Sequence, residues 1–332
     1  MSKSLQATAI SSPNIAFVKY WGKRDSALNL PTRNSLSMTL GAPLETKTTV
    51  TFDPKLGADT LLMNGKAVEG DGLARACRVL DAVRKEAKLA LHASISSSNS
   101  FPTGTGIASS ASGFAALASA AWAAAGLKWD EKKVSAIARI GSGSASRSIA
   151  GGFVIWEKGK KPDGWDSFAS SFAPPSHWPE LRDLVVVLDD AHKKVGSNAG
   201  MQDSVKTSKL YPPYVKEGDR RVEKIKGLIL SKNLPSLLEE IMAESDALHA
   251  VMADTTPPLY YMNENSKKVA AFVRQYNARV GKTVVGYTFD AGPNAHLITT
   301  ADRVEELKKE VSKLVPVKAF FVSAPGPGVK VL

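Results

Sequence analysis

The chain has 332 residues, of which 43% are hydrophobic and 23% are charged, and its formal net charge is +11. This length predicts two domains or one large one, and the composition is ordinary for a globular protein in water. No stretch reaches the roughly 18 consecutive apolar residues of a membrane-spanning helix, and the first ten residues lack the apolar run of a signal peptide. The single cysteine, Cys77, excludes an internal disulfide and fits a reducing compartment. We therefore expect a cytoplasmic protein without a membrane partner.

The positive charge is spread along the chain. Its densest run, at 216–227, alternates with acidic residues and is typical of a solvated helix face. No ribonucleoprotein motif or zinc-finger spacing accompanies it. The charge therefore favours a phosphorylated small-molecule substrate at least as well as nucleic acid, and we expect no nucleic-acid partner.

The first half of the chain combines strands and helices. β-branched or alternating residues predict strands at 15–21, 35–40, 46–52 and 91–98. Helices are expected at 72–89, 109–125 and 130–140. The middle helix is rich in alanine, which suits a helix buried between layers because neighbouring backbone can approach it closely.

The second half follows a proline-rich loop at 172–181 and begins with an apolar strand at 184–189. Further strands are expected at 284–290, 296–300 and 317–323, and long helices at 219–230, 235–253, 263–280 and 302–313. Helices grouped against a sheet in each half predict an α+β protein with two domains, 1–183 and 184–332.

FPTGTGIASSASG, at 101–113, looks like a phosphate-binding loop without its lysine. It does not match the Walker pattern, because Phe114 follows Gly113, nor the dinucleotide pattern, because Ser109 occupies the third glycine position. What remains is a glycine loop leading into a helix with serines in its first turn. Free backbone N–H groups and hydroxyls there suit an anion or a magnesium ion. A serine-capped turn before a buried helix explains the pattern equally well.

GSGSASRS, at 141–148, places four hydroxyls, two glycines and Arg147 within eight residues. Arg147 can bind a carboxylate or phosphate through two hydrogen bonds. The alternative is a flexible linker. An apolar helix precedes the stretch and an apolar strand follows it, which favours a buried anion-binding segment.

Two charged residues lie beside apolar strands. Asp290 ends the strand at 284–290, where a carboxylate can act as a general base, although a lone aspartate there is more often a turn residue. Lys19 lies in the expected strand at 15–21, with Trp21 on its face and Tyr20 on the other. A lysine in an apolar strand is unfavourable unless it meets an anion, which can be a ligand or a structural partner.

Taken together and in order, these segments resemble the GHMP superfamily of small-molecule kinases, and within it the diphosphomevalonate decarboxylase family. The matching segments span roughly residues 13 to 297 and are NIAFVKYWGKRD, LNLPTRNSLSMTL, FPTGTGIASSASGFAALASA, ARIGSGSASRSIAGGFVIW, VGSNAGMQDSV, PPLYYMNENSKKV and VVGYTFDAGPNAHL.

The resemblance implies an N-terminal domain like domain 2 of ribosomal protein S5, a ferredoxin-like C-terminal domain and a site between them. It implies ATP-dependent decarboxylation of mevalonate 5-diphosphate to isopentenyl diphosphate, in the mevalonate pathway. The expected cofactors are ATP and Mg²⁺, and the chain is expected to form a homodimer.

The resemblance also implies roles for individual residues. Asp290 would orient or deprotonate the 3-hydroxyl, Lys19 would keep Asp290 ionised, and Arg147 would bind the substrate carboxylate. The remaining substrate contacts would come from Tyr20, Lys23, Ser142, Gly143, Ser144 and Ser197. The ATP contacts would come from Gly104, Gly106, Ala108, Ser109, Ser110 and Ser112, with Ser109 and Ser110 near the metal.

Two departures from the family pattern stand out. The loop reads PTGTG where many members read PTAAG, and Asn198 replaces a charged or hydroxyl residue of some members, which puts diphosphate contacts there in doubt. The same scaffold also suits a mevalonate 5-phosphate decarboxylase or a mevalonate 3-kinase. Asp290, Lys19 and Arg147 together favour decarboxylation. An RNA-binding S5-like protein would leave Asp290 and the serine loops unexplained.

Overall fold

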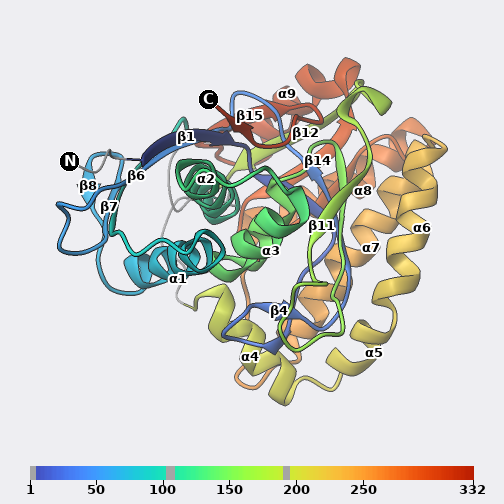
Figure 1. The fold of residues 1–332 in the computed structure, drawn as a ribbon. Coiled ribbons are helices and arrows are strands. Elements are labelled where there is room, and N and C mark those ends of the chain that lie inside the picture. Colours follow the sequence, from blue (N-terminus) through green and yellow to red (C-terminus); the bar gives the residue numbers. More distant parts are fainter. Residues whose placement is uncertain (1–4, 102–108, 190–194) are drawn as a thin grey trace.

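The computed structural model describes residues 5–101, 109–189 and 195–332 (Figure 1). Its first sheet has six strands in the order β16-β1-β6-β9-β7-β8. These strands are β1 (Leu5–Ser11), β6 (Thr46–Phe52), β7 (Thr60–Met63), β8 (Lys66–Ala67), β9 (Ala93–Asn99) and β16 (Lys330–Val331). Three helices lie beside it, namely α1 (Gly70–Ala87), α2 (Ser109–Ala124) and α3 (Glu131–Gly141). Eight of the ten alanines at 108–125 lie within α2, whose small side chains let it pack directly against β1 and β6.

A second sheet, in the order β11-β10-β5-β2, lies deeper in the molecule. Its strands are β2 (Asn14–Val18), β5 (Ser35–Thr39), β10 (Phe153–Trp156) and β11 (Ala169–Ala173). Every residue of β2, β5 and β10 is buried, which explains why these strands read as continuous apolar or small-residue runs. A short ribbon of β3 (Lys23–Asp25) and β4 (Leu30–Pro31) and the 3₁₀ helix η1 (Gly143–Ser148) complete this half.

The second half has a four-stranded antiparallel sheet in the order β13-β14-β12-β15. Its strands are β12 (Leu181–Val187), β13 (Gly286–Thr288), β14 (Ala295–Thr300) and β15 (Ala319–Ser323). The 3₁₀ helices η2 (Pro175–His177) and η3 (Ala301–Arg303) lie just before β12 and after β14. The helices are α4 (Ser197–Thr207), α5 (Tyr211–Lys216), α6 (Gly218–Leu230), α7 (Leu234–Ala253), α8 (Glu264–Val280) and α9 (Val304–Leu314). Within the part of the chain that the structure describes, no helix is long and apolar enough to cross a membrane.

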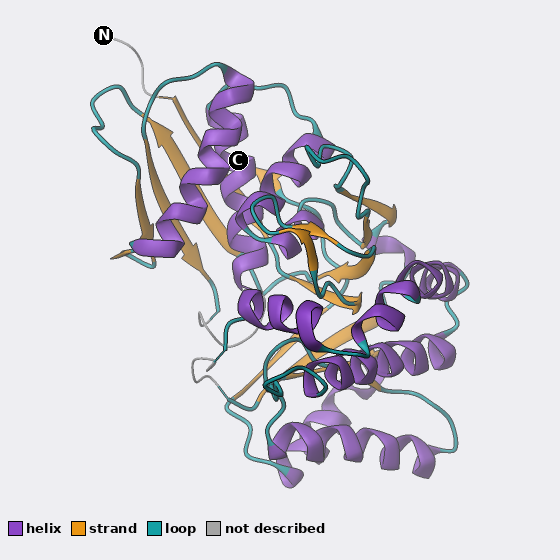
Figure 2. Cartoon of the chain, turned by 90° about the horizontal axis from the view of Figure 1, so that it is seen from below, coloured by secondary structure: helices purple, strands orange, loops and turns teal. Residues whose placement is uncertain are grey.

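The two halves share a hydrophobic core. Phe17 of β2 and Met38 of β5 belong to the same buried cluster as Val185 of β12 and Ile225 of α6. The chain end reinforces this connection, because β16 pairs with β1 of the first sheet after β15 has completed the last one. Figures 1 and 2 show the first sheet at one end of the molecule and helices α5 to α8 at the other. The second sheet and its surroundings therefore lie between them, where the functional residues gather.

The expected α+β fold with two domains is confirmed, and most expected elements lie within a few residues of their predicted positions. The strand predicted at 15–21 is wrong in its extent, because β2 ends at Val18. Pairing with β5 becomes irregular after Ala16, and the backbone N–H of Lys19 binds the side chain of Glu244 instead of a strand neighbour. Lys19 and Trp21 therefore do not share the face of a strand. The structure also contains elements that were not expected, namely the strands β1, β3, β4, β7, β8, β11 and β16 and the helices α4 and α5.

Candidate active site

An ion pair between Lys19 and Asp290 joins the two halves of the chain. Lys19 follows β2 directly, and Asp290 lies two residues after β13. The Lys19 Nζ donates to the Asp290 Oδ1 at 2.7 Å. The side chain of Lys19 is 2% exposed whereas that of Asp290 is 36% exposed, so the carboxylate retains an open side. The structure thus gives Lys19 the anion that its buried position requires, while Asp290 stays accessible to a ligand.

Asp290 is held in its ionised form. Burial raises the pKa of this carboxyl, but the charge and hydrogen bond of Lys19, with the charges of His296 and Arg147, outweigh burial and bring the pKa to about 2. Because the pKa in the folded state lies below the ordinary value, ionisation of Asp290 stabilises the fold above about pH 4. That contribution is lost as the pH falls through about 2. Asp290 is therefore a carboxylate throughout the neutral range.

Arg147 is a buried cation without a carboxylate partner among the described residues. Its side chain lies in η1 and is 3% exposed. The Nε donates to Asn14 Oδ1 at 3.1 Å, and one terminal nitrogen donates to Ser35 Oγ at 2.8 Å. Burial lowers the pKa of Arg147 to about 10, which leaves it charged at neutral pH. A buried guanidinium that neutral groups orient in this way is suited to an anion that arrives from outside.

A row of serine hydroxyls connects α2 to η1. The Ser110 and Ser142 hydroxyls lie 3.3 Å apart, and so do the Ser142 and Ser144 hydroxyls. Gly143 lies between the last two and packs on Tyr20, since a side chain there would come within 2.5 Å of the ring. Burial raises the pKa of Tyr20, and its hydroxyl has no partner among the described residues. The row and the tyrosine hydroxyl provide neutral donors beside Arg147.

Lys23 lies on β3 and contacts the second half of the chain. Its Nζ donates to Asn29 Oδ1 at 2.6 Å and to Asn198 Oδ1 at 2.9 Å. Asn198, one of the two departures from the family pattern, thus holds a cation, next to Ser197 at the start of α4. Burial, with the charges of Arg75 and Arg78, lowers the pKa of Lys23 to about 8. This is a cation that gives up its proton within the range of an ordinary assay.

A largely apolar pocket opens beside the first turn of α2. The pocket has a cavity volume of about 150 Å³. Its lining combines Ser109, Ser110, Gly113 and Phe114 of α2 with residues of β6, β7, α1 and β9. The remaining lining residues are Thr48, Leu61, Met63, Ala76, Ile95, Ser97, Asn99 and Leu117. Its lining suits the end of a flat apolar or aromatic group, with a polar part at the serines.

Not every serine of the α2 turn faces this pocket. Ser112 is fully buried, its hydroxyl lies 2.6 Å from that of Thr46, and it also donates to the Ser109 carbonyl. Gly104, Gly106 and Ala108 lie outside the described residues, so the loop that carries them is not placed.

Sequence reasoning missed several residues of the site. Asn14 and Ser35 orient Arg147 although nothing in their local patterns marks them. Arg75 of α1 donates to the carbonyl of Gly141, at the start of the serine stretch, and lies over the ring of Phe114. On the sequence alone, Arg75 is an ordinary polar position of an amphipathic helix.

Comparison with known proteins identifies the family to which the chain belongs. The model of the diphosphomevalonate decarboxylase-like N-terminal domain matches residues 11–169, and the model of the mevalonate 5-diphosphate decarboxylase C-terminal domain matches residues 183–324. A diphosphomevalonate decarboxylase of Ganoderma lucidum is 42% identical over 331 residues, covering 94% of this chain and 82% of the relative.

Solved structures are similar over nearly the whole length. The mevalonate diphosphate decarboxylase of Staphylococcus aureus has a TM-score of 0.93 at 34% identity, covering 99% of this chain and 98% of that one. A complex described as MDDEF with MVAPP, AMPPCP and magnesium has a TM-score of 0.92 at 35% identity and covers 99% of both chains. With two family models that together span most of its length and a relative well above 30% identity, the chain belongs to the diphosphomevalonate decarboxylase family.

Proposed function

We propose that the protein converts mevalonate 5-diphosphate and ATP into isopentenyl diphosphate, ADP, phosphate and carbon dioxide. One observation carries this proposal: an ionised, accessible Asp290 is held by Lys19, and the charge of the buried Arg147, which has no carboxylate partner among the described residues, reaches it. The substrate is a 3-hydroxy acid. A site for it requires a protein carboxylate that contacts the substrate hydroxyl and a protein guanidinium that binds the substrate carboxylate.

The substrate would lie across η1 and the end of β2. Arg147 would bind its carboxylate through two charge-assisted hydrogen bonds, beyond those that already orient the guanidinium. The diphosphate would lie among the remaining groups, where hydroxyls and one cation converge. These are Tyr20, Lys23, Ser142, Gly143, Ser144 and Ser197.

ATP would bind beside α2, because the pocket there has an apolar lining that suits a base and ends at the hydroxyls of Ser109 and Ser110. The apolar lining would receive the base, and Ser109 and Ser110 would meet the phosphates together with Gly104, Gly106 and Ala108 of the preceding loop. Magnesium, bound through Ser109, Ser110 and the phosphates, would offset their negative charge. Ser112 would anchor α2 to β6 through Thr46 and thereby fix the direction of the first turn.

The low pKa of Asp290 defines its part in the chemistry. A carboxylate with a pKa of about 2 is too weak a base to remove the proton of a tertiary alcohol in advance. It would orient the 3-hydroxyl and accept its proton late, as the γ-phosphoryl group transfers to that oxygen. The bond from C3 to the phosphate oxygen then breaks and phosphate leaves; the bond between C2 and the carboxylate carbon breaks, its electron pair forms the new C2=C3 double bond, and carbon dioxide departs. Lys19 would stabilise charge near the transferred group.

The products separate this reaction from its alternatives. Incubation with ATP and either mevalonate 5-diphosphate or mevalonate 5-phosphate, with carbon dioxide and ADP measured together, tests the proposal. We expect carbon dioxide and ADP in equal amounts from the diphosphate. A phosphorylated product without carbon dioxide would show a 3-kinase, and a preference for the monophosphate would show the other decarboxylase.

Several wider expectations belong to the same proposal. We propose a division into two domains near residue 183, supported by one family model that ends at 169 and a second that begins at 183. We also propose that the protein works in the cytoplasm as a homodimer and without nucleic acid. The homodimer follows from the resemblance, the cytoplasmic location from the single cysteine, and the absence of nucleic acid from the dispersed charge and from the fact that RNA binding would leave Asp290 and the serine loops unexplained.

Replacing the carboxylate of Asp290 tests its role. We expect Asp290→Asn to lower kcat by roughly 10³-fold, since the amide cannot accept the proton, while calorimetric Kd values for ATP and substrate change little. The exposed Asp302→Asn, in the turn after β14, is the matched control and should leave kcat unchanged. Near-normal turnover in Asp290→Asn would remove this residue from the mechanism.

Arg147 and Arg139 form a natural pair for comparison, because both are buried arginines. Arg139 donates to the carbonyls of Leu28, Gly164 and Ser167, so its role is structural. We expect Arg147→Lys to raise the substrate KM at least about 10-fold through loss of a bidentate charged contact, with little change in ATP binding. Arg139→Lys should lower the melting temperature without a selective effect on KM. Unchanged KM and kcat in Arg147→Lys would contradict the carboxylate contact.

Lys23 should produce an alkaline limb in the pH profile. Its pKa is lowered to about 8, so the ammonium is present below that pH and is lost above it. Because kcat/KM reports the free enzyme, its value for the diphosphate substrate should fall above about pH 8. Lys23→Arg should remove this limb, since a guanidinium stays charged. A limb that persists in Lys23→Arg would exclude Lys23 as its source.

The proposed nucleoside pocket can be filled from Gly113. A Cβ at this position meets nothing within 4 Å, and the position lines the pocket. We expect Gly113→Leu to raise the KM for ATP at least about 10-fold by occupying that space, with the substrate Kd unchanged. Gly113→Ala is the control, and it should keep ATP affinity while gaining up to about 1 kcal/mol of stability. Equal ATP affinity in the leucine variant would place the nucleoside elsewhere.

A further inference from the structure

Two consecutive residues of α7 contact the backbone at both partners of the Lys19–Asp290 pair. Glu244 Oε1 accepts a hydrogen bond from the backbone N–H of Lys19 at 3.0 Å. Ser245 Oγ accepts one from the backbone N–H of Phe289, the residue before Asp290, at 3.0 Å. Lys19 and Asp290 are 271 positions apart in the chain, yet the two side chains that bind the backbone at or next to these positions come from neighbouring residues of one helix.

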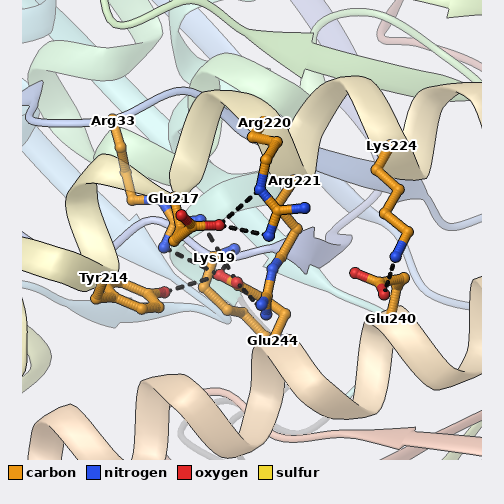
Figure 3. Close-up of polar contacts among 9 residues, drawn as sticks. All are labelled: Lys19, Arg33, Tyr214, Glu217, Arg220, Arg221, Lys224, Glu240 and Glu244. Atoms are coloured by element: carbon orange, nitrogen blue, oxygen red, sulfur yellow. Dashed lines mark hydrogen bonds and ion pairs between the residues drawn. The ribbon is translucent and has the colours of Figure 1, made fainter.

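Glu244 is itself rigidly held. Its side chain is 1% exposed, and its carboxylate receives the Tyr214 hydroxyl at 2.8 Å and Arg221 at 3.1 Å, while Arg33 lies 3.2 Å away. Figure 3 shows these groups converging on Glu244 from α5, α6 and the segment after β4, with Lys19 beside them. A buried carboxylate with this many partners has one orientation, so the backbone at Lys19 is fixed with it.

Ser245 is equally enclosed, with 1% of its surface exposed. It lies where α7 packs against β13, and α7 also packs against β2. A helix is stiff over one residue step, because its backbone hydrogen bonds set the rise and rotation between neighbours. The positions of Glu244 and Ser245 therefore set the separation between the end of β2 and the end of β13.

We propose that Glu244 and Ser245 are positioning residues of the reaction, which hold Lys19 and Asp290 in register through their backbones. This proposal rests on the proposed function of that pair. Neither residue touches a reacting group, and their effect is transmitted through the 2.7 Å contact between Lys19 Nζ and Asp290 Oδ1. A loss of register lengthens this contact, which misplaces the carboxylate and weakens the charge that keeps it ionised.

The pKa of Asp290 separates positioning from a merely structural role. The charged or titratable groups that face it are Lys19, Arg147 from η1, His296 from β14 and His249 from α7. Burial and then Lys19 lower the pKa of His249 to about 4, so this imidazole is neutral in the assay range. A variant that only destabilises the fold leaves the Lys19 contact intact in the molecules that remain folded. A variant that disturbs the register raises the pKa of Asp290.

The experiment compares Ser245→Ala and Glu244→Gln with Glu240→Gln. Glu240 lies one turn earlier on α7, where its ion pair with Lys224 spans 2.6 Å at the surface (Figure 3). For each protein, kcat, the Kd of substrate and nucleotide, the melting temperature and the carboxyl ¹³C titration of Asp290 are measured, with Asp290→Asn assigning the resonance.

We expect Ser245→Ala and Glu244→Gln to lower kcat by about 10- to 100-fold, with Kd values within about threefold of the wild type. The Asp290 titration should move upward by at least one pH unit. Glu240→Gln should match the wild type in all of these. An unchanged kcat and an unchanged Asp290 titration in Ser245→Ala would overturn the proposal. If Glu244→Gln does not fold, the result for Ser245→Ala is sufficient to test the proposal.

Failure of the proposed function would look different. In that case the wild-type protein would release no carbon dioxide from mevalonate 5-diphosphate, or the Asp290→Asn variant would remain active. The NMR titration needs no turnover, so it tests whether Glu244 and Ser245 hold the pair in either case.

Discussion

The ion pair between Lys19 and Asp290 is the constraint on which the rest of the site depends. A buried ion pair is weak evidence for stability, because desolvation of the two charges opposes their attraction. Its value here lies in what it does to Asp290, a carboxylate that remains ionised while one side stays open. For the pair to form, the end of β2 and the end of β13 must meet. The core that β2 and β5 share with β12 and α6 brings the two halves together.

The proposed phosphate-binding loop at 101–113 lacks a lysine, so the positive charge of the proposed site would come from elsewhere. The net charge of +11 is mostly dispersed over the surface and screened by salt at long range. The charges proposed to bind the substrate belong to a few cations whose hydrogen-bond partners are neutral. Arg147 is oriented by an amide and a hydroxyl, and Lys23 by two asparagines. Neutral partners orient a cation without neutralising it, so its charge remains free for an anionic substrate.

The sequence was sufficient to predict the fold and to propose the reacting groups, but it did not identify the residues that hold these groups in place. Arg147 lies in a stretch whose composition marks it, whereas Asp290 alone was more typical of a turn residue, and only the GHMP resemblance implied a role for both. The position of Lys19 was misjudged because alternation was carried past Val18, where a tertiary hydrogen bond to Glu244 replaces strand pairing. Glu244 and Ser245 lie in a predicted helix and look like ordinary polar positions. Only the packing of α7 against β2 and β13 places their side chains beside the backbone of Lys19 and Phe289.

The central claim is that Asp290, held by Lys19, faces the hydroxyl that accepts the phosphoryl group. A crystal structure of the protein with a non-hydrolysable ATP analogue, magnesium and mevalonate 5-diphosphate tests this most directly. The account predicts the Asp290 carboxylate within hydrogen-bond distance of the 3-hydroxyl, which points at the terminal phosphate, and Arg147 on the substrate carboxylate. A substrate whose 3-hydroxyl lies away from Asp290, with the Lys19 contact intact, would contradict it.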